Sequence, residues 1–95
     1  MLLECKKPTV RSIEILMPAK LGFHLRVVSR FVKCVQKFDS DIRVRKERII
    51  ANGKSVLGLL VLVAAWRSKL HIEAEGNDAE QTIDAIKDFF QTDNG

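Results

Sequence analysis

The chain has 95 residues, of which 46% are hydrophobic and 29% charged, and it carries a formal net charge of +4 at pH 7. This length and composition exclude a disordered chain and indicate a single globular domain over residues 1–95, with residues 1–8 as a flexible N-terminal extension. The longest apolar run, Val56–Trp66, is too short for a membrane-spanning helix, which needs about 20 residues. The two cysteines have no metal-ligand spacing, so we expect a cytoplasmic protein without a metal or cofactor and without membrane insertion.

Hydrophobic periodicity predicts seven elements along the chain. In chain order they are a strand at 9–17, a helix at 25–37, strands at 40–46 and 48–52, a helix at 56–66, a strand at 69–75 and a helix at 78–90. The two middle strands meet near Lys46–Glu47 without the Asn-Gly signal of a tight hairpin. Asn77 or Asp78 is expected to cap the last helix. The pattern predicts an α+β fold with three helices on one side of an antiparallel sheet.

The two outer helices each show one apolar face at three- and four-residue spacing. The residues expected on these buried faces are Val27, Val28, Phe31, Val32, Cys34 and Val35 in the first and Ile83, Ile86, Phe89 and Phe90 in the last. Phe38 is also expected to be buried. His71 alternates with Leu70 and Ile72 in its strand, so we expect it to be a solvated residue on the opposite face.

Positive charge is concentrated in the first half of the chain. Residues 1–50 hold 12 Lys and Arg against 5 Asp and Glu, whereas residues 51–95 hold 4 against 7. A basic half of this kind is typical of a protein that binds an acidic partner, a phosphorylated group or nucleic acid. The alternative is a solvated basic face without a partner. With five Phe, one Trp and no Tyr, the chain offers few stacking platforms for bases, which disfavours nucleic acid.

His24 lies where the backbone turns into the first predicted helix, after Gly22 and Phe23 and before Leu25 and Arg26. The first N–H groups of a helix have no intrahelical acceptor and attract anions, phosphate above all. A neutral imidazole is a competent nucleophile, so a phosphoryl group on His24 would lie among these N–H groups. Arg26 would reach it with a forked guanidinium. The alternative is a solvated histidine or a weak cap.

Ser55 starts the second predicted helix in a similar way. One interpretation is an N-cap, and the other is a regulatory phosphorylation site whose added negative charge the helix dipole tolerates. The neighbouring Val56, Leu57 and Leu60 are either core residues or an apolar docking surface for a partner.

Taken together, these segments resemble the histidine-containing phosphocarrier (HPr) family of the sugar phosphotransferase system. "GFHLR" resembles its active-site loop, "NGKSVLGLL" its regulatory-serine segment and "IEAEGNDAEQTIDAIKDFF" its closing strand and helix. The resemblance runs from about Val10 to Phe90, and it implies an open-faced β-sandwich with the order βαββαβα.

The resemblance also implies roles for individual residues. His24 matches the histidine that accepts a phosphoryl group from phosphorylated enzyme I and passes it to enzyme II A-domains, and Arg26 matches the arginine beside it. Ser55 matches the serine that a kinase phosphorylates in some members. Gly22, Phe23, Leu25, Val56, Leu57 and Leu60 are the expected partner-binding residues. A carrier of this kind is a phosphoryl-group shuttle rather than a free-standing enzyme, and we expect a monomer.

Two residues depart from the family pattern His-Ala-Arg-Pro, because Leu25 and Val27 replace the small residue and the proline. Val27 restores an N–H and is expected to make the first turn less rigid, and Leu25 adds bulk beside the imidazole. Arg67 stands where a glycine turn is common, next to Trp66. These departures leave open an HPr-like regulator that binds partners without efficient transfer, and the basic half leaves open a small nucleic-acid-binding domain.

Overall fold

The computed structural model describes residues 9–17, 24–62 and 68–92. Seven elements follow one another in the order β1, α1, β2, β3, α2, β4, α3. Their bounds are β1 Val10–Leu16, α1 Leu25–Gln36, β2 Asp41–Lys46, β3 Ile49–Asn52, α2 Val56–Val61, β4 Lys69–Glu75 and α3 Ala79–Thr92. The predicted α+β fold is therefore confirmed, and the expected 1–8 extension lies outside the described residues.

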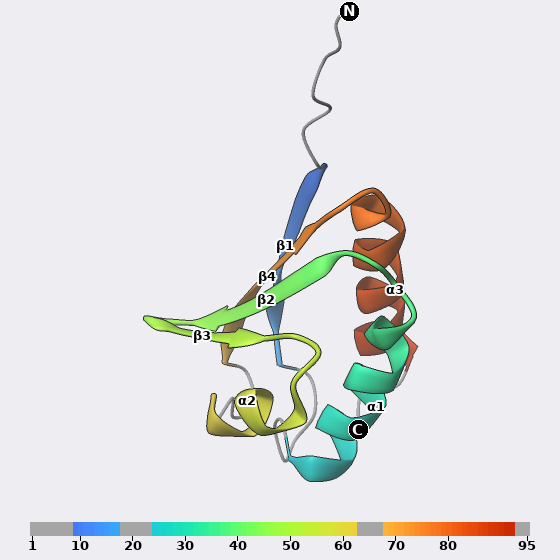
Figure 1. Cartoon of the computed structure of the whole chain (residues 1–95). Coiled ribbons are helices and arrows are strands. Elements are labelled where there is room, and N and C mark those ends of the chain that lie inside the picture. Colours follow the sequence, from blue (N-terminus) through green and yellow to red (C-terminus); the bar gives the residue numbers. More distant parts are fainter. Residues whose placement is uncertain (1–8, 18–23, 63–67, 93–95) are drawn as a thin grey trace, which may run out of the picture.

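The four strands form one antiparallel sheet in the order β1-β4-β2-β3. Helices α1 and α3 lie side by side against one face of this sheet, and α2 lies next to β3 (Figure 1). None of the helices in the described residues lies on the opposite face (Figure 1). Among the described residues, no helix is long and apolar enough to cross a membrane.

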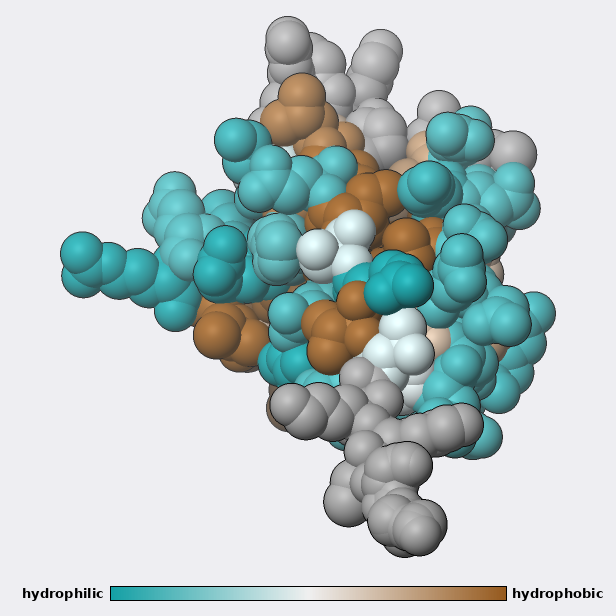
Figure 2. Space-filling model, turned by 90° about the horizontal axis from the view of Figure 1, so that it is seen from above, coloured by the Kyte–Doolittle hydropathy of each residue, from teal (hydrophilic) through white to brown (hydrophobic). Residues whose placement is uncertain are grey.

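The core lies between the sheet and the helices, and it follows the predicted periodicity closely. Phe31 of α1 packs against Phe89 and Phe90 of α3, with ring centroids 5.6 and 5.8 Å apart. The outer surface of these helices, on the right in Figures 1 and 2, is covered by hydrophilic side chains. Cys34 packs against this core with part of its surface free, but the expectation for Phe38 was wrong, since its side chain is only half-buried. Phe38 follows the helix and lies under the Lys37 ammonium group, 5.6 Å from its ring centroid.

The β2–β3 connection is a tight hairpin that the sequence did not signal. Lys46 pairs with Ile49, so only Glu47 and Arg48 form the turn. Glu47 has φ 57°, a left-handed conformation that costs a non-glycine residue about 1 kcal/mol. This turn closes the hairpin that Figure 1 shows projecting to the left.

The second helix is shorter than predicted. It ends at Val61 rather than Trp66, and residues 63–67, which include Trp66 and Arg67, lie outside the described residues. Gly53 lies between β3 and this helix and contacts β2, where its N–H donates to the Ile42 carbonyl at 2.7 Å. An added Cβ at Gly53 would meet the Ile42 side chain, which explains the glycine.

Candidate functional site

His24 is the N-cap residue of α1, with extended backbone at φ −94° and ψ 175°. Its carbonyl accepts the first helical hydrogen bond from the Val28 N–H at 2.9 Å. Its half-buried imidazole makes no cap hydrogen bond to the helix. The backbone of His24 therefore starts the helix while its ring stays available for chemistry.

The first turn of α1 offers N–H donors that have no intrahelical acceptor. The N–H groups of Leu25, Arg26 and Val27 precede the first intrahelical donor, and no acidic side chain lies in the turn to occupy them. Arg26 is exposed, and its guanidinium makes no hydrogen bond or ion pair with the residues that the structure describes. Backbone N–H groups, the positive end of the helix dipole and a guanidinium favour a bound phosphoryl group.

The two departures from the family pattern have different consequences. Val27 is 3% exposed and belongs to the hydrophobic core. Its side chain anchors the first turn, so the helix begins at Leu25 without a proline, and its N–H adds a donor that proline lacks. Leu25 is 60% exposed and presents an apolar side chain to any partner that reaches His24.

Ser55 is the N-cap residue of α2, as one of the two interpretations predicted. Its hydroxyl oxygen accepts the Gly58 N–H at 3.0 Å, and its carbonyl accepts the Leu59 N–H at 3.0 Å. No acidic side chain lies in the first turn of this helix. The half-buried hydroxyl is part of the fold, and this role does not exclude phosphorylation.

We expect Ser55→Ala to lower the free energy of unfolding by about 1 kcal/mol, because the Gly58 N–H loses its acceptor. Urea unfolding followed by circular dichroism measures the change. Ser29→Ala is the matched control, since Ser29 is exposed within α1, and it should change the stability by less than about 0.5 kcal/mol. Equal effects of the two substitutions would show that the cap does not stabilise the fold.

The predicted partner-binding residues divide into exposed and half-buried ones. Leu57 is 73% exposed, whereas Val56 and Leu60 pack against the core with part of their surface free. Val61, which the sequence analysis did not single out, is 63% exposed on the same helix. Gly22 and Phe23 lie outside the described residues.

The helix bearing Ser55 is held to the rest of the molecule by the residue before it. The Lys54 ammonium group donates to the Phe38 carbonyl, and the Lys54 N–H donates to the Asn52 side chain at 2.8 Å.

Within the described part of the chain, no group of three or more His, Cys, Asp or Glu residues is placed to hold a metal ion.

Comparisons with known proteins show which proteins the chain is similar to. Residues 11–92 match the family model described as "PTS HPr component phosphorylation site". The phosphocarrier protein HPr of Neisseria meningitidis is 36% identical over 79 residues, which are 83% of this chain and 86% of that protein. HPr of Treponema pallidum is 32% identical over 82 residues, which are 86% of this chain and 91% of that protein.

Solved structures give the same result. A crystal structure of HPr from Thermoanaerobacter tengcongensis superposes with a TM-score of 0.85 at 32% identity, covering 90% of this chain and 96% of that one. A second crystal structure from that organism, described as an HPr dimer, superposes with a TM-score of 0.71 at 33% identity over 85% of this chain and 93% of that one.

Proposed function

The chain belongs to the HPr phosphocarrier family of the phosphotransferase system, and from this we propose that it accepts a phosphoryl group on His24 from phosphorylated enzyme I and donates it to enzyme II A-domains. The observation that carries the proposal is the imidazole of His24, which makes no cap hydrogen bond and lies at the start of a helix whose first N–H groups have no intrahelical acceptor. Phosphoryl uptake at this ring leaves the hydrogen bonds of the described fold unchanged.

The proposed transfer exchanges one bond for another. A lone pair on a ring nitrogen of His24 forms the new N–P bond while the bond between phosphorus and the donor group of enzyme I breaks, and the electron pair of that bond leaves with the donor. The first-turn N–H groups and Arg26 stabilise the negative charge of the phosphoryl oxygens. Transfer to an A-domain is the same exchange with the acceptor as nucleophile.

Exposed apolar side chains near the helix starts fit brief docking of protein partners. Leu25 and Leu57 are 60% and 73% exposed, and Val61 extends this apolar surface along α2. The excess of basic residues in the first half of the chain would speed encounters with partners that have acidic surfaces without requiring tight binding. The carrier can then leave each partner quickly.

The direct test incubates the purified protein with phosphoenolpyruvate and a cognate enzyme I and follows its intact mass. We expect a gain of about 80 Da for one phosphoryl group, which is lost again when an enzyme II A-domain is added. A folded protein that gains no mass from an active donor would contradict the carrier and support an HPr-like regulator that only binds partners.

We further propose that phosphorylation of Ser55 by a kinase, reversed by a phosphatase, slows uptake at His24. The added charge would lie at the N-terminus of α2, next to exposed Leu57. There it would be tolerated by the helix and would repel an acidic partner.

Ser55→Glu should therefore slow phosphoryl uptake from enzyme I by about tenfold, the size expected when one unfavourable charge is placed in an electrostatically steered contact. Initial rates at several salt concentrations measure this effect, and the difference from the wild type should shrink as salt rises. Gln81→Glu is the matched control, because Gln81 is exposed on α3, away from both helix starts. If Gln81→Glu slowed phosphoryl uptake equally, the effect of Ser55→Glu would come from net charge alone.

A shuttle between several partners is best served by a freely diffusing molecule. We propose a cytoplasmic monomer, and size-exclusion chromatography with light scattering measures its mass. A stable dimer, the state named for one of the Thermoanaerobacter tengcongensis structures, would contradict the proposal of a monomer.

A further inference from the structure

The sheet face without helices carries a row of ionisable side chains that the proposed phosphoryl transfer does not use. Glu14 of β1 pairs with His71 of β4, and His71 pairs with Arg45 of β2. These three residues lie on the open face, because their neighbours Leu70, Ile72 and Val44 point into the core on the other side. Three strands therefore contribute to one transverse row.

The two arginines of β2 on this face differ in their partners. Arg43 donates to Glu73 at 2.9 Å and to Glu75 at 2.9 Å, and these hydrogen bonds, first that to Glu75, raise the pKa of its guanidinium. Arg45, two residues along, makes no hydrogen bond or ion pair with the described residues. Carboxylates thus neutralise Arg43 at one end of the open face, whereas the Arg45 guanidinium has no acceptor in the part of the chain that the structure describes.

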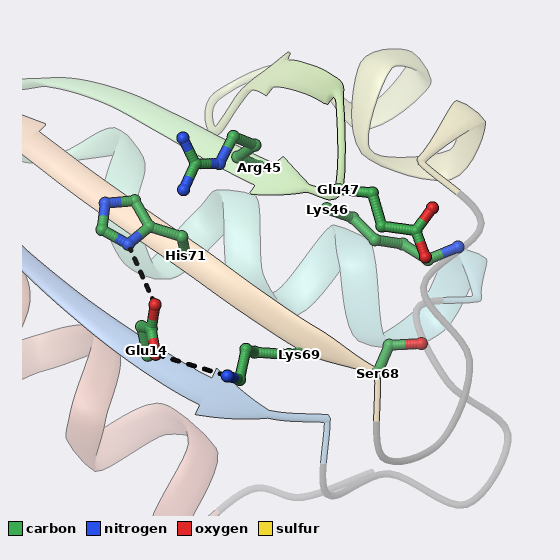
Figure 3. Close-up of a pocket in the computed structure, with 7 residues that line it drawn as sticks. All are labelled: Glu14, Arg45, Lys46, Glu47, Ser68, Lys69 and His71. Atoms are coloured by element: carbon green, nitrogen blue, oxygen red, sulfur yellow. Dashed lines mark ion pairs between the residues drawn. The ribbon is translucent and has the colours of Figure 1, made fainter.

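His71 beside Arg45 is also incompletely satisfied. Its Nδ1 is shielded from solvent and has no hydrogen-bond partner among the described residues. The nearest carboxylate oxygen, Oε2 of Glu14, lies 3.7 Å away, which is an ion-pair distance and too long for a hydrogen bond. Figure 3 shows Nδ1 turned toward Glu14 and the other ring nitrogen turned away from it. The outward ring nitrogen is therefore placed to contact a ligand on the side away from Glu14.

These side chains surround an open pocket of about 300 Å³. Its lining residues are Glu14, Arg45, Lys46, Glu47, Ser68, Lys69 and His71. Basic side chains outnumber acidic ones, and Glu14 is engaged by Lys69 at 3.9 Å as well as by His71. The lining thus offers a guanidinium, ammonium groups, an imidazole and a hydroxyl as donors, and no aromatic side chain on which a nucleic-acid base could stack.

We propose that this pocket, defined by Arg45, Lys69 and His71 on the open face of the sheet, binds a small molecule that carries two or more phosphoryl groups. Arg45 binds one phosphoryl group through its unoccupied fork, and Lys69 and His71 bind the other from β4. A concave site of this size suits a small metabolite rather than a polymer. The site lies on the sheet face opposite the helices, so it is separate from the proposed phosphoryl carrier on α1.

The test titrates ¹⁵N-labelled protein with sodium pyrophosphate and follows amide chemical shifts at a constant ionic strength of about 0.15 M. We expect saturable shifts at residues 14, 45, 46, 69 and 71. Arg45→Gln should weaken binding by about tenfold, since the loss of one charge-assisted pair costs that much. Lys33→Gln is the charge-matched control, because Lys33 is exposed on α1, and it should leave the affinity within about twofold.

Any of three other outcomes would contradict the proposed diphosphate site. Shifts confined to the first turn of α1 would place the anion at the proposed phosphoryl-carrier site and not on the sheet. Equal weakening by Arg45→Gln and Lys33→Gln would show non-specific attraction to a basic protein. An absence of saturable shifts at the pocket residues would show that the pocket does not bind a diphosphate. Phosphoryl uptake at His24 is measured separately, so failure of this site leaves the carrier function standing.

Discussion

His24→Ala should take up no phosphoryl group from phosphoenolpyruvate and enzyme I, whereas His71→Ala should take up as much as the wild type. The chain has only these two histidines, so the pair forms an internal control. His24 lies at the N-terminus of α1, whose first N–H groups have no intrahelical acceptor, and His71 lies on the open sheet face next to Glu14. Of these two environments, only that of His24 offers helix N–H groups, which would stabilise a covalently bound phosphoryl group.

Intact mass spectrometry measures this difference as the presence or absence of the gain of about 80 Da. The His24→Ala protein should remain folded, because the imidazole makes no cap hydrogen bond, and its free energy of unfolding should change by less than about 0.5 kcal/mol. Labelling that persists in His24→Ala and disappears in His71→Ala would move the phosphoryl acceptor to the open sheet face. Labelling that persists in both variants would exclude a histidine acceptor.

Features that depend on local periodicity could be predicted from the sequence. The apolar positions of α1 at three- and four-residue spacing are buried as expected, with Val28, Phe31 and Val35 fully enclosed. Ser55 was predicted as an N-cap, and its hydroxyl accepts the Gly58 N–H. These predictions succeed because helix faces and caps are decided by residues within one or two turns.

Features set by contacts between distant segments could not be predicted in the same way. The sequence left open whether Leu57 is a core residue or part of an exposed docking surface. Leu57 is exposed and Leu59 is fully buried, because their exposure depends on how α2 lies against β3. The row of Glu14, His71 and Arg45 depends on the register of three strands. His71 was predicted as a solvated residue on the outer face, and the sequence carried no signal that its Nδ1 would be shielded.

Asp78, at the start of α3, is a second case in which a contact between distant segments could not be predicted from the sequence. Its position before α3 was predicted, and its carbonyl accepts the Thr82 N–H at 2.9 Å. Its carboxylate, however, binds a segment nearly 40 positions earlier in the chain. It accepts the N–H groups of Asp39 at 2.8 Å and Ser40 at 3.0 Å, and also the Ser40 hydroxyl. The side chain therefore fixes the α1–β2 connection to the β4–α3 connection.

We expect Asp78→Ala to lower the free energy of unfolding by about 3 kcal/mol, because it removes a charged acceptor from three donors and leaves the Ser40 groups without a partner. Ser40 is fully buried, so water cannot replace the lost acceptor. Urea unfolding at neutral pH measures the change. Asp84→Ala is the matched control, since Asp84 is exposed on α3, and it should cost less than about 0.5 kcal/mol. Similar losses of unfolding free energy in the two variants would show that the Asp78 carboxylate does not hold the two connections together.

The same contribution should depend on pH with a defined sign. The hydrogen bond from the Ser40 hydroxyl, followed by that from the Asp39 N–H, lowers the pKa of the Asp78 carboxyl below its ordinary value. The unfolded chain then binds a proton at this residue more readily than the folded protein does, so acid favours unfolding. The stability difference between wild type and Asp78→Ala should be full above about pH 5 and should shrink as the pH falls toward about 3. A difference that stays constant over this range would show that the carboxylate charge plays no part in holding the two connections together.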